Sequence, residues 1–155
     1  MLSKVISGGQ NGVDQAALRA AKKSGLATGG YMPSNYLTLD GPRPDLAIEY
    51  GMVALSSPKY PPRTKRNVAD SDGTLQIAKR LDSPGERLTA KCVAELGKPR
   101  FVVDLNKPVD IAAIKEWLIA QRIKTLNVAG NSLKSCPGID KIAEEILLAV
   151  FKTQS

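Results

Sequence analysis

Two kinds of hydrophobic pattern alternate along this chain of 155 residues. Short runs rich in β-branched residues indicate strands, and longer stretches with apolar residues three or four positions apart indicate helices. Strands are predicted over residues 4–7, 73–78, 100–104 and 125–129, and a short apolar run fits a further strand over 52–55. Helices are predicted over residues 13–24, 63–71, 86–96, 108–121 and 137–152.

The alternation of strands and helices predicts an α/β fold with a doubly wound, mostly parallel sheet and helices on both faces. The length suits one domain, which we expect to span residues 1–155. The segment 27–45, rich in glycine and proline, is predicted to be an irregular and functional loop. Sheets of this kind bind ligands beyond the carboxyl ends of their strands, so those ends are where a site is expected.

Composition narrows the chemistry that the chain can perform. It contains no histidine and two cysteines 44 positions apart, which excludes histidine-based catalytic triads and a four-ligand Cys/His zinc site within one chain. The net charge of +7 favours an anionic partner, while 5% aromatic residues weaken the case for a base-stacking surface. No leader or membrane-spanning segment is predicted, so the expected location is the cytoplasm.

Glycine-rich turns follow the first predicted strand. Residues 7–14 read Ser-Gly-Gly-Gln-Asn-Gly-Val-Asp, and three glycines between a strand and a helix leave backbone N–H groups free to bind an anion. The turn matches neither the Walker motif nor the full dinucleotide motif. Chain reversal alone is the competing interpretation, and Asp14 is then a complement to the helix dipole.

Three other strand ends carry polar residues. Arg63, Asn67 and Asp70 recur at helical spacing; Arg63 can bind an anion, and Asp70 with Asp72 can hold Mg²⁺ or simply cap the helix. Residues 83–89 form a glycine-bearing turn that opens a helix, and the strand over 125–129 ends near Asn127 and Gly130. Lys59 to Arg66 form either a solvated basic face or a contact for nucleic acid.

Motifs in five segments of the chain together resemble the family of proteins called molybdenum carriers. Residues 7–18 resemble its S-G-G-Q-T-G-V-D-x-A-A-L opening, and residues 29–33 its G-G-[WY]-x-P segment. Residues 63–75 resemble R-T-x-x-N-V-x-D-S-D-[AG]-T-L, and residues 126–130 and 137–139 resemble L-N-V-A-G and P-G-I. Two departures are Asn11, where the family has Thr, and residues 84–89, where a G-G-T-x-L-T segment loses a glycine and gains the carboxylate of Glu86.

The resemblance implies a Rossmann-like fold related to lysine decarboxylase-like and DNA-processing A proteins. It also implies binding of molybdenum cofactor, molybdate or a nucleotide, a homo-oligomeric state and delivery to a molybdoenzyme. It argues against phosphoribohydrolase activity, because the P-G-G-x-G-T-x-x-E segment of those enzymes is not retained beyond Pro84 and Gly85.

The leading hypothesis is therefore a carrier for a small anionic, phosphate-bearing ligand rather than an enzyme. We expect the ligand to be bound by backbone N–H groups of the first loop, by the charges of two arginines and by side-chain amides. The full set of expected binding residues is Gly8, Gly9, Gln10, Asn11, Gly12, Gly30, Arg63, Thr64, Asn67, Arg87, Thr89, Asn127 and Gly130. In that hypothesis Asp70 and Asp72 orient Arg63 or hold Mg²⁺. The alternatives are a nucleotide-processing hydrolase or transferase that uses Asp70 or Asp72 and, ranked last, nucleic-acid binding through residues 59–66.

Overall fold

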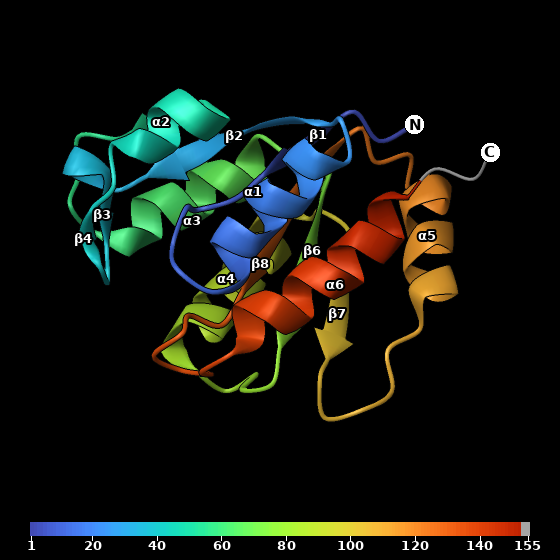
Figure 1. Cartoon of the computed structure of the whole chain (residues 1–155). Coiled ribbons are helices and arrows are strands. Elements are labelled where there is room, and N and C mark those ends of the chain that lie inside the picture. The colour runs from blue at the N-terminus through green and yellow to red at the C-terminus, as the bar shows by residue number, and fades with distance from the viewer. Residues whose placement is uncertain (153–155) are drawn as a thin grey trace.

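The computed structural model describes residues 1–152 and forms a six-stranded sheet in the order β5-β2-β1-β8-β6-β7 (Figure 1). Every neighbouring pair of strands in this sheet is parallel. This confirms the predicted α/β class with a parallel sheet. The strands are β1 (Lys4–Ile6), β2 (Ala27–Met32), β5 (Met52–Ala54), β6 (Gly73–Ala78), β7 (Arg100–Asp104) and β8 (Thr125–Gly130).

Helices cover both faces of the sheet, as the Rossmann-like class requires (Figure 1). α1 and α6 pack side by side on one face, with α5 beside α6, and α3 packs against α4 on the other. The helices are α1 (Val13–Lys23), α2 (Asp45–Tyr50), α3 (Tyr60–Ala69), α4 (Pro84–Leu96), α5 (Ile111–Ala120) and α6 (Ile139–Phe151).

The main core lies between the sheet and the layer of α1 and α6. Four alanines of α1, at positions 16, 17, 20 and 21, are completely buried there. Because alanine has a small side chain, α1 can approach both the sheet and α6 closely. This close packing fixes the start of α1 against the carboxyl end of β1. It therefore also fixes the segment that joins them, residues 7–12, which we call the glycine loop.

The prediction of an irregular segment over 27–45 is wrong. The segment contains β2, a short 3₁₀ turn (Ser34–Tyr36), a two-stranded hairpin of β3 (Leu37–Thr38) and β4 (Gly41–Pro42), and the first residue of α2. Gly29 and Gly30 suggested a loop, yet β2 is an inner strand between β1 and β5. A glycine inside a strand marks a close approach of another backbone, and a Cβ atom on Gly30 would overlap the carbonyl oxygen of Ser7.

Four helices begin elsewhere than the sequence predicts, each for a local reason. α4 begins at Pro84 rather than at residue 86, because Ser83 caps it and a proline fits the first turn. α3 begins at Tyr60 rather than at residue 63, because Pro61 and Pro62 occupy its first turn, where backbone N–H groups have no helical acceptor. α5 begins at Ile111, after Asp110 accepts a hydrogen bond from the N–H of Ala113 at 3.0 Å. α6 begins at Ile139, because Gly138 takes a left-handed conformation.

Candidate functional site

A cavity of about 220 Å³ lies at the carboxyl ends of the central strands. Its wall combines the β1–α1 loop, the first turns of α3 and α4, the end of β8 and the tip of the β3–β4 hairpin. The residues that matter to its chemistry are Gln10, Asp14, Tyr60, Arg63, Ser83, Glu86, Thr89 and Ser132. The structure therefore brings residues from all four polar strand ends to one hollow, at the edge of the sheet where the sequence predicted a site.

The backbone N–H groups of the glycine loop are largely engaged by the chain's own side chains. The N–H of Gly9 donates to the hydroxyl of Ser7 at 3.4 Å, and the N–H of Gln10 donates to the Asp14 carboxylate at 3.2 Å. The N–H of Asn11 donates to the Gln10 side-chain carbonyl at 3.0 Å. The loop binds an anion as its geometry predicts, but that anion is the carboxylate of Asp14.

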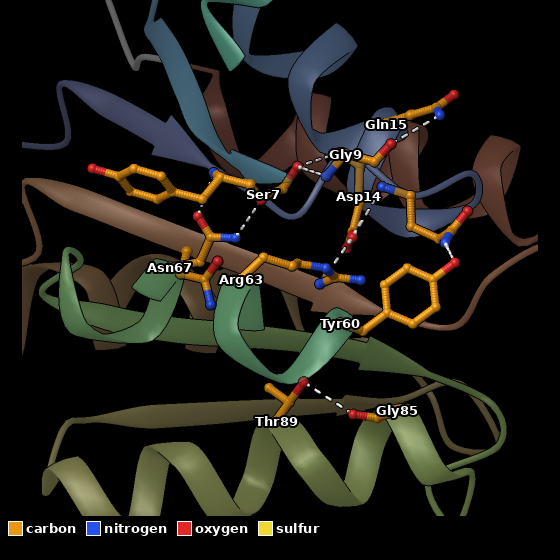
Figure 2. Close-up of polar contacts among 12 residues, drawn as sticks. Ser7, Gly9, Asp14, Gln15, Tyr60, Arg63, Asn67, Gly85 and Thr89 are labelled. Atoms are coloured by element: carbon orange, nitrogen blue, oxygen red, sulfur yellow. Dashed lines mark hydrogen bonds and ion pairs between the residues drawn. The ribbon is translucent and has the colours of Figure 1, made fainter. Parts of the chain in front are cut away.

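The glycines of the loop have a packing role that the sequence did not reveal. A Cβ atom on Gly8 would overlap the guanidinium of Arg63, which lies directly over the loop (Figure 2). Gly12 has a φ of 95°, and a Cβ there would overlap the backbone carbonyl of Asn131. Close approach by Arg63 and by the end of β8 therefore accounts for glycine at these two positions.

The side chains of Gln10 and Asn11 attach the β3–β4 hairpin to the glycine loop. The Gln10 carbonyl accepts a hydrogen bond from the N–H of Leu39 at 2.9 Å, and its amide donates to the Tyr60 hydroxyl at 3.2 Å. The Asn11 amide donates to the carboxylate of Asp40 at 3.1 Å, and its carbonyl accepts from the N–H of Leu133 at 3.0 Å. These residues were predicted to contact a ligand, and the structure shows them joining three segments of the cavity wall.

Replacing Asp40 with alanine is expected to loosen the hairpin, because it removes the hydrogen bond that the Asn11 amide donates. The expected cost is about 0.5–1 kcal/mol of stability, with faster amide hydrogen exchange at Leu39 than in the wild type. Hydrogen exchange followed by mass spectrometry measures this. Asp45→Ala is the matched control, since within residues 1–152 the carboxylate of Asp45 forms its one ion pair with Arg43, on the surface. Equal exchange at Leu39 in Asp40→Ala and the wild type would contradict the prediction.

Arg63 lies between the glycine loop and the first turn of α4 (Figure 2). Its Nη1 atom lies 3.8 Å from the Asp14 carboxylate, and its guanidinium lies 5.3 Å from the centre of the Tyr60 ring. Its Nε atom is buried and has no hydrogen-bond partner among residues 1–152. A buried guanidinium nitrogen without an acceptor is costly to the fold, so an acceptor supplied from the cavity would be favourable.

The first turn of α4 is occupied by the carboxylate of Glu86. The Ser83 hydroxyl caps the helix by accepting a hydrogen bond from the N–H of Glu86, and it donates to the Glu86 carboxylate at 3.0 Å. The same carboxylate accepts from the Asn131 side chain at 3.2 Å. Glu86 is buried, so a negative charge of the chain itself sits where a helix N-terminus attracts anions.

Burial raises the pKa values of both carboxyl groups. The pKa of Asp14 rises to about 6, because desolvation outweighs the attraction of Arg63 and the hydrogen bond from Gln10, and the nearby Glu86 adds to the rise. Burial also raises the pKa of Glu86, against the hydrogen bonds from Ser83, Gln76 and Asn131 and the charge of Arg63. Perturbed groups that share a cavity are typical of functional sites.

Several predicted site residues lie outside the cavity. The side-chain amide of Asn67 bonds to both the N–H and the carbonyl of Tyr31 in β2, and the amide of Asn127 donates to Thr74. Arg87 is exposed on the outer side of α4. Thr64, Thr89 and Gly130 do line the cavity, although the Thr89 hydroxyl donates to the Gly85 carbonyl at 3.1 Å (Figure 2).

Asp70 and Asp72 are placed away from Arg63. Asp72 precedes β6 and accepts hydrogen bonds from the N–H groups of Lys124 and Thr125, which holds its pKa below the usual value. It therefore lies at the amino ends of the strands, opposite the glycine loop. Asp70 pairs with Arg66, at 3.3 Å, at the end of α3. Within residues 1–152 no three His, Cys, Asp or Glu side chains are grouped to hold a metal ion.

Sequence reasoning missed the central role of Asp14, Tyr60 and Asn131. Asp14 follows the glycine loop, and its position after three glycines is the pattern that could have identified it. Tyr60 and Asn131 carry no such pattern, because only the tertiary fold brings Tyr60 to the cavity and Asn131 to the carboxylate of Glu86. Of the helices in the described part of the chain, none is long and apolar enough to cross a bilayer.

A doubly wound sheet with a polar cavity at the carboxyl ends of its central strands is the arrangement of Rossmann-like ligand-binding proteins. The chain belongs to one family of that class, the circularly permutated YpsA SLOG family, whose model matches residues 5–151. It is 34% identical to a protein of known structure named "putative molybdenum carrier protein" from Syntrophus aciditrophicus SB, with a TM-score of 0.89, over 98% of this chain and 96% of that one. No curated protein matches the chain.

Proposed function

We propose that this protein binds a small ligand through an anionic group, such as the phosphate of molybdenum cofactor or of a nucleotide. The observation that carries the proposal is the buried Nε atom of Arg63, which lacks an acceptor beside a polar cavity. A planar guanidinium offers paired N–H groups that match the oxygen atoms of a phosphate. The structural relative named as a molybdenum carrier supports a molybdenum-related ligand.

The size of the cavity limits how much of the ligand it can enclose. Pockets that enclose a drug-sized molecule have volumes of roughly 300–1,000 Å³, and this cavity has about 220 Å³. We therefore expect it to hold the anionic end of the ligand, while the remainder lies at its mouth near the β3–β4 hairpin. Delivery to a molybdoenzyme and assembly into a homo-oligomer remain part of the proposal.

Thermal unfolding with candidate ligands tests the proposal. Molybdate, molybdopterin, AMP, ADP-ribose and nicotinamide nucleotides form the panel, and a ligand at 100 times its Kd is expected to stabilise the fold by about 2.7 kcal/mol. For a chain of this size that is a rise in Tm of roughly 5–10 °C. If no member of the panel raises the Tm at millimolar concentration, the proposal is wrong.

Replacing Arg63 with glutamine is expected to weaken binding of the active ligand by roughly 10- to 100-fold, because hydrogen bonds to a charged group contribute about 1.5–3 kcal/mol each. Titration calorimetry measures the loss. Arg63→Lys keeps the charge but not the planar pair of donors, and its affinity is expected to fall between the two. Lys65→Gln is the matched control, since Lys65 is an exposed cation on the same helix. Equal loss in Lys65→Gln would contradict a specific role for Arg63.

A further inference from the structure

Both positions in the cavity that are built to attract an anion already hold a carboxylate of the chain. At the glycine loop, Asp14 accepts the N–H of Gln10. At the first turn of α4, Glu86 is held by Ser83 and Asn131. Both side chains line the cavity, so a ligand that enters it meets them directly.

The charges in the cavity wall do not suit a free dianion. Among the described residues that line it, Arg63 is the one cation, and Asp14 and Glu86 are the two anions. The two carboxylates repel molybdate or inorganic phosphate and the one guanidinium attracts it, so the cavity gives these anions no net attraction. Desolvation of the anion adds a further cost. The positive net charge of the whole chain is therefore not reproduced inside its cavity.

The carboxylates have acceptor capacity left for a ligand. A carboxylate can accept about four hydrogen bonds, and within residues 1–152 the Oδ1 atom of Asp14 accepts none while Oδ2 accepts one. A hydroxyl or amino group of a ligand can donate to such an oxygen in a charge-assisted bond. The two carboxylates repel a bare anion, but they attract a ligand that also carries hydrogen-bond donors.

Resting on the proposed function, we propose that Asp14 and Glu86 determine the specificity of the cavity. They disfavour free inorganic oxyanions and favour a phosphate ester whose remainder carries hydrogen-bond donors, such as a vicinal diol. Arg63 binds the phosphate, and the carboxylates accept hydrogen bonds from the adjoining hydroxyl groups. The ligand class is therefore a phosphorylated polyol or nucleotide rather than bare molybdate.

Competition between simple probes tests this proposal. Inorganic phosphate, molybdate and ribose 5-phosphate are titrated into the wild type and into Glu86→Gln. We expect the wild type to bind ribose 5-phosphate at least about tenfold more tightly than either inorganic anion, as one charge-assisted hydrogen bond allows. In Glu86→Gln the preference is expected to fall at least about fivefold, mainly because the inorganic anions bind more tightly.

The variants separate a change in specificity from a change in folding. The side-chain oxygen of glutamine can accept the same hydrogen bonds from Ser83 and Asn131, so Glu86→Gln is expected to fold. Glu95→Gln is the matched control, since Glu95 lies on the exposed surface of the same helix and pairs with Lys91. It removes the same charge and is expected to leave the preference unchanged.

Three outcomes decide between the proposals. If Glu86→Gln shows the wild-type preference while Arg63→Gln weakens all probes, the proposed function stands and the specificity proposal is overturned. If the wild type binds molybdate as tightly as ribose 5-phosphate, the specificity proposal is again wrong. If the wild type binds no probe and no member of the ligand panel, both proposals fail together.

Discussion

Replacing Gly30 with alanine is expected to destabilise the fold by about 3 kcal/mol or more, which corresponds to a fall in Tm of roughly 6–12 °C. The φ of Gly30 is 134°, a backbone conformation that alanine rarely adopts. The new Cβ would also overlap the carbonyl oxygen of Ser7 in the neighbouring segment. Neither β2 nor the end of β1 can move away, because both lie inside the sheet.

The neighbouring glycine provides a matched control for this prediction. A Cβ on Gly29 would lie 3.2 Å from Cε of Lys4, the flexible end of an exposed side chain. Gly29→Ala is therefore expected to change stability by less than about 1 kcal/mol. Thermal or urea unfolding of the two variants measures the difference. Similar stability losses in both would show that strand propensity, rather than contact with Ser7, explains the glycine.

Stability is expected to fall as the pH rises from about 4 to about 7, because of Asp14. Its pKa is about 6 in the folded protein, against 3.8 as the ordinary value. Between these values the unfolded chain loses the proton while the folded chain keeps it, so ionisation favours the unfolded state. The penalty is complete above the folded pKa and amounts to about 3 kcal/mol. Burial of Glu86 acts in the same direction.

Comparing the wild type with Asp14→Asn isolates this contribution. Urea unfolding at several pH values is expected to show that the difference in unfolding free energy, wild type minus variant, decreases by about 2–3 kcal/mol between pH 4 and pH 7. Glu145→Gln removes an exposed carboxylate on α6 and is expected to leave the pH profile unchanged. A constant difference between the wild type and Asp14→Asn across this range would falsify the assignment of the pH dependence to Asp14.

Elements with a regular pattern were predicted correctly, and elements shaped by contacts were not. The buried strands β6 and β7 and the helices α1 and α6 lie where their periodicity places them, within one or two residues at each end. The strand β2 was missed because Gly29 and Gly30 have no side chains and so interrupt the hydrophobic pattern by which a strand is recognised. Helix α2 was missed because its six residues are too few to show a period.

The motifs located the candidate site, but they did not predict that carboxylates of the chain itself, Asp14 and Glu86, lie at its anion-binding positions. Ser7 to Gly12 and Arg63 were correctly expected to lie near one another, since both follow strands of one sheet. The expectation that the loop's N–H groups are free is wrong for Gly9, Gln10 and Asn11, whose N–H groups donate to side chains of the chain. Those hydrogen bonds depend on where α1 and the hairpin pack, which no local pattern encodes.

The amino-acid sequence by itself determined the class of fold and the edge of the sheet that carries the candidate site, because periodicity and glycine placement act over short distances along the chain. It also singled out Arg63 as a candidate for binding an anion. Tertiary structure alone decided that Asp14 and Glu86 occupy the anion positions, that Gln10 and Asn11 hold the hairpin and that Asp72 lies at the opposite edge. Those outcomes depend on contacts between segments far apart in the chain. The burial and the charge environment of each side chain are set there by residues that are its neighbours in space but not in sequence.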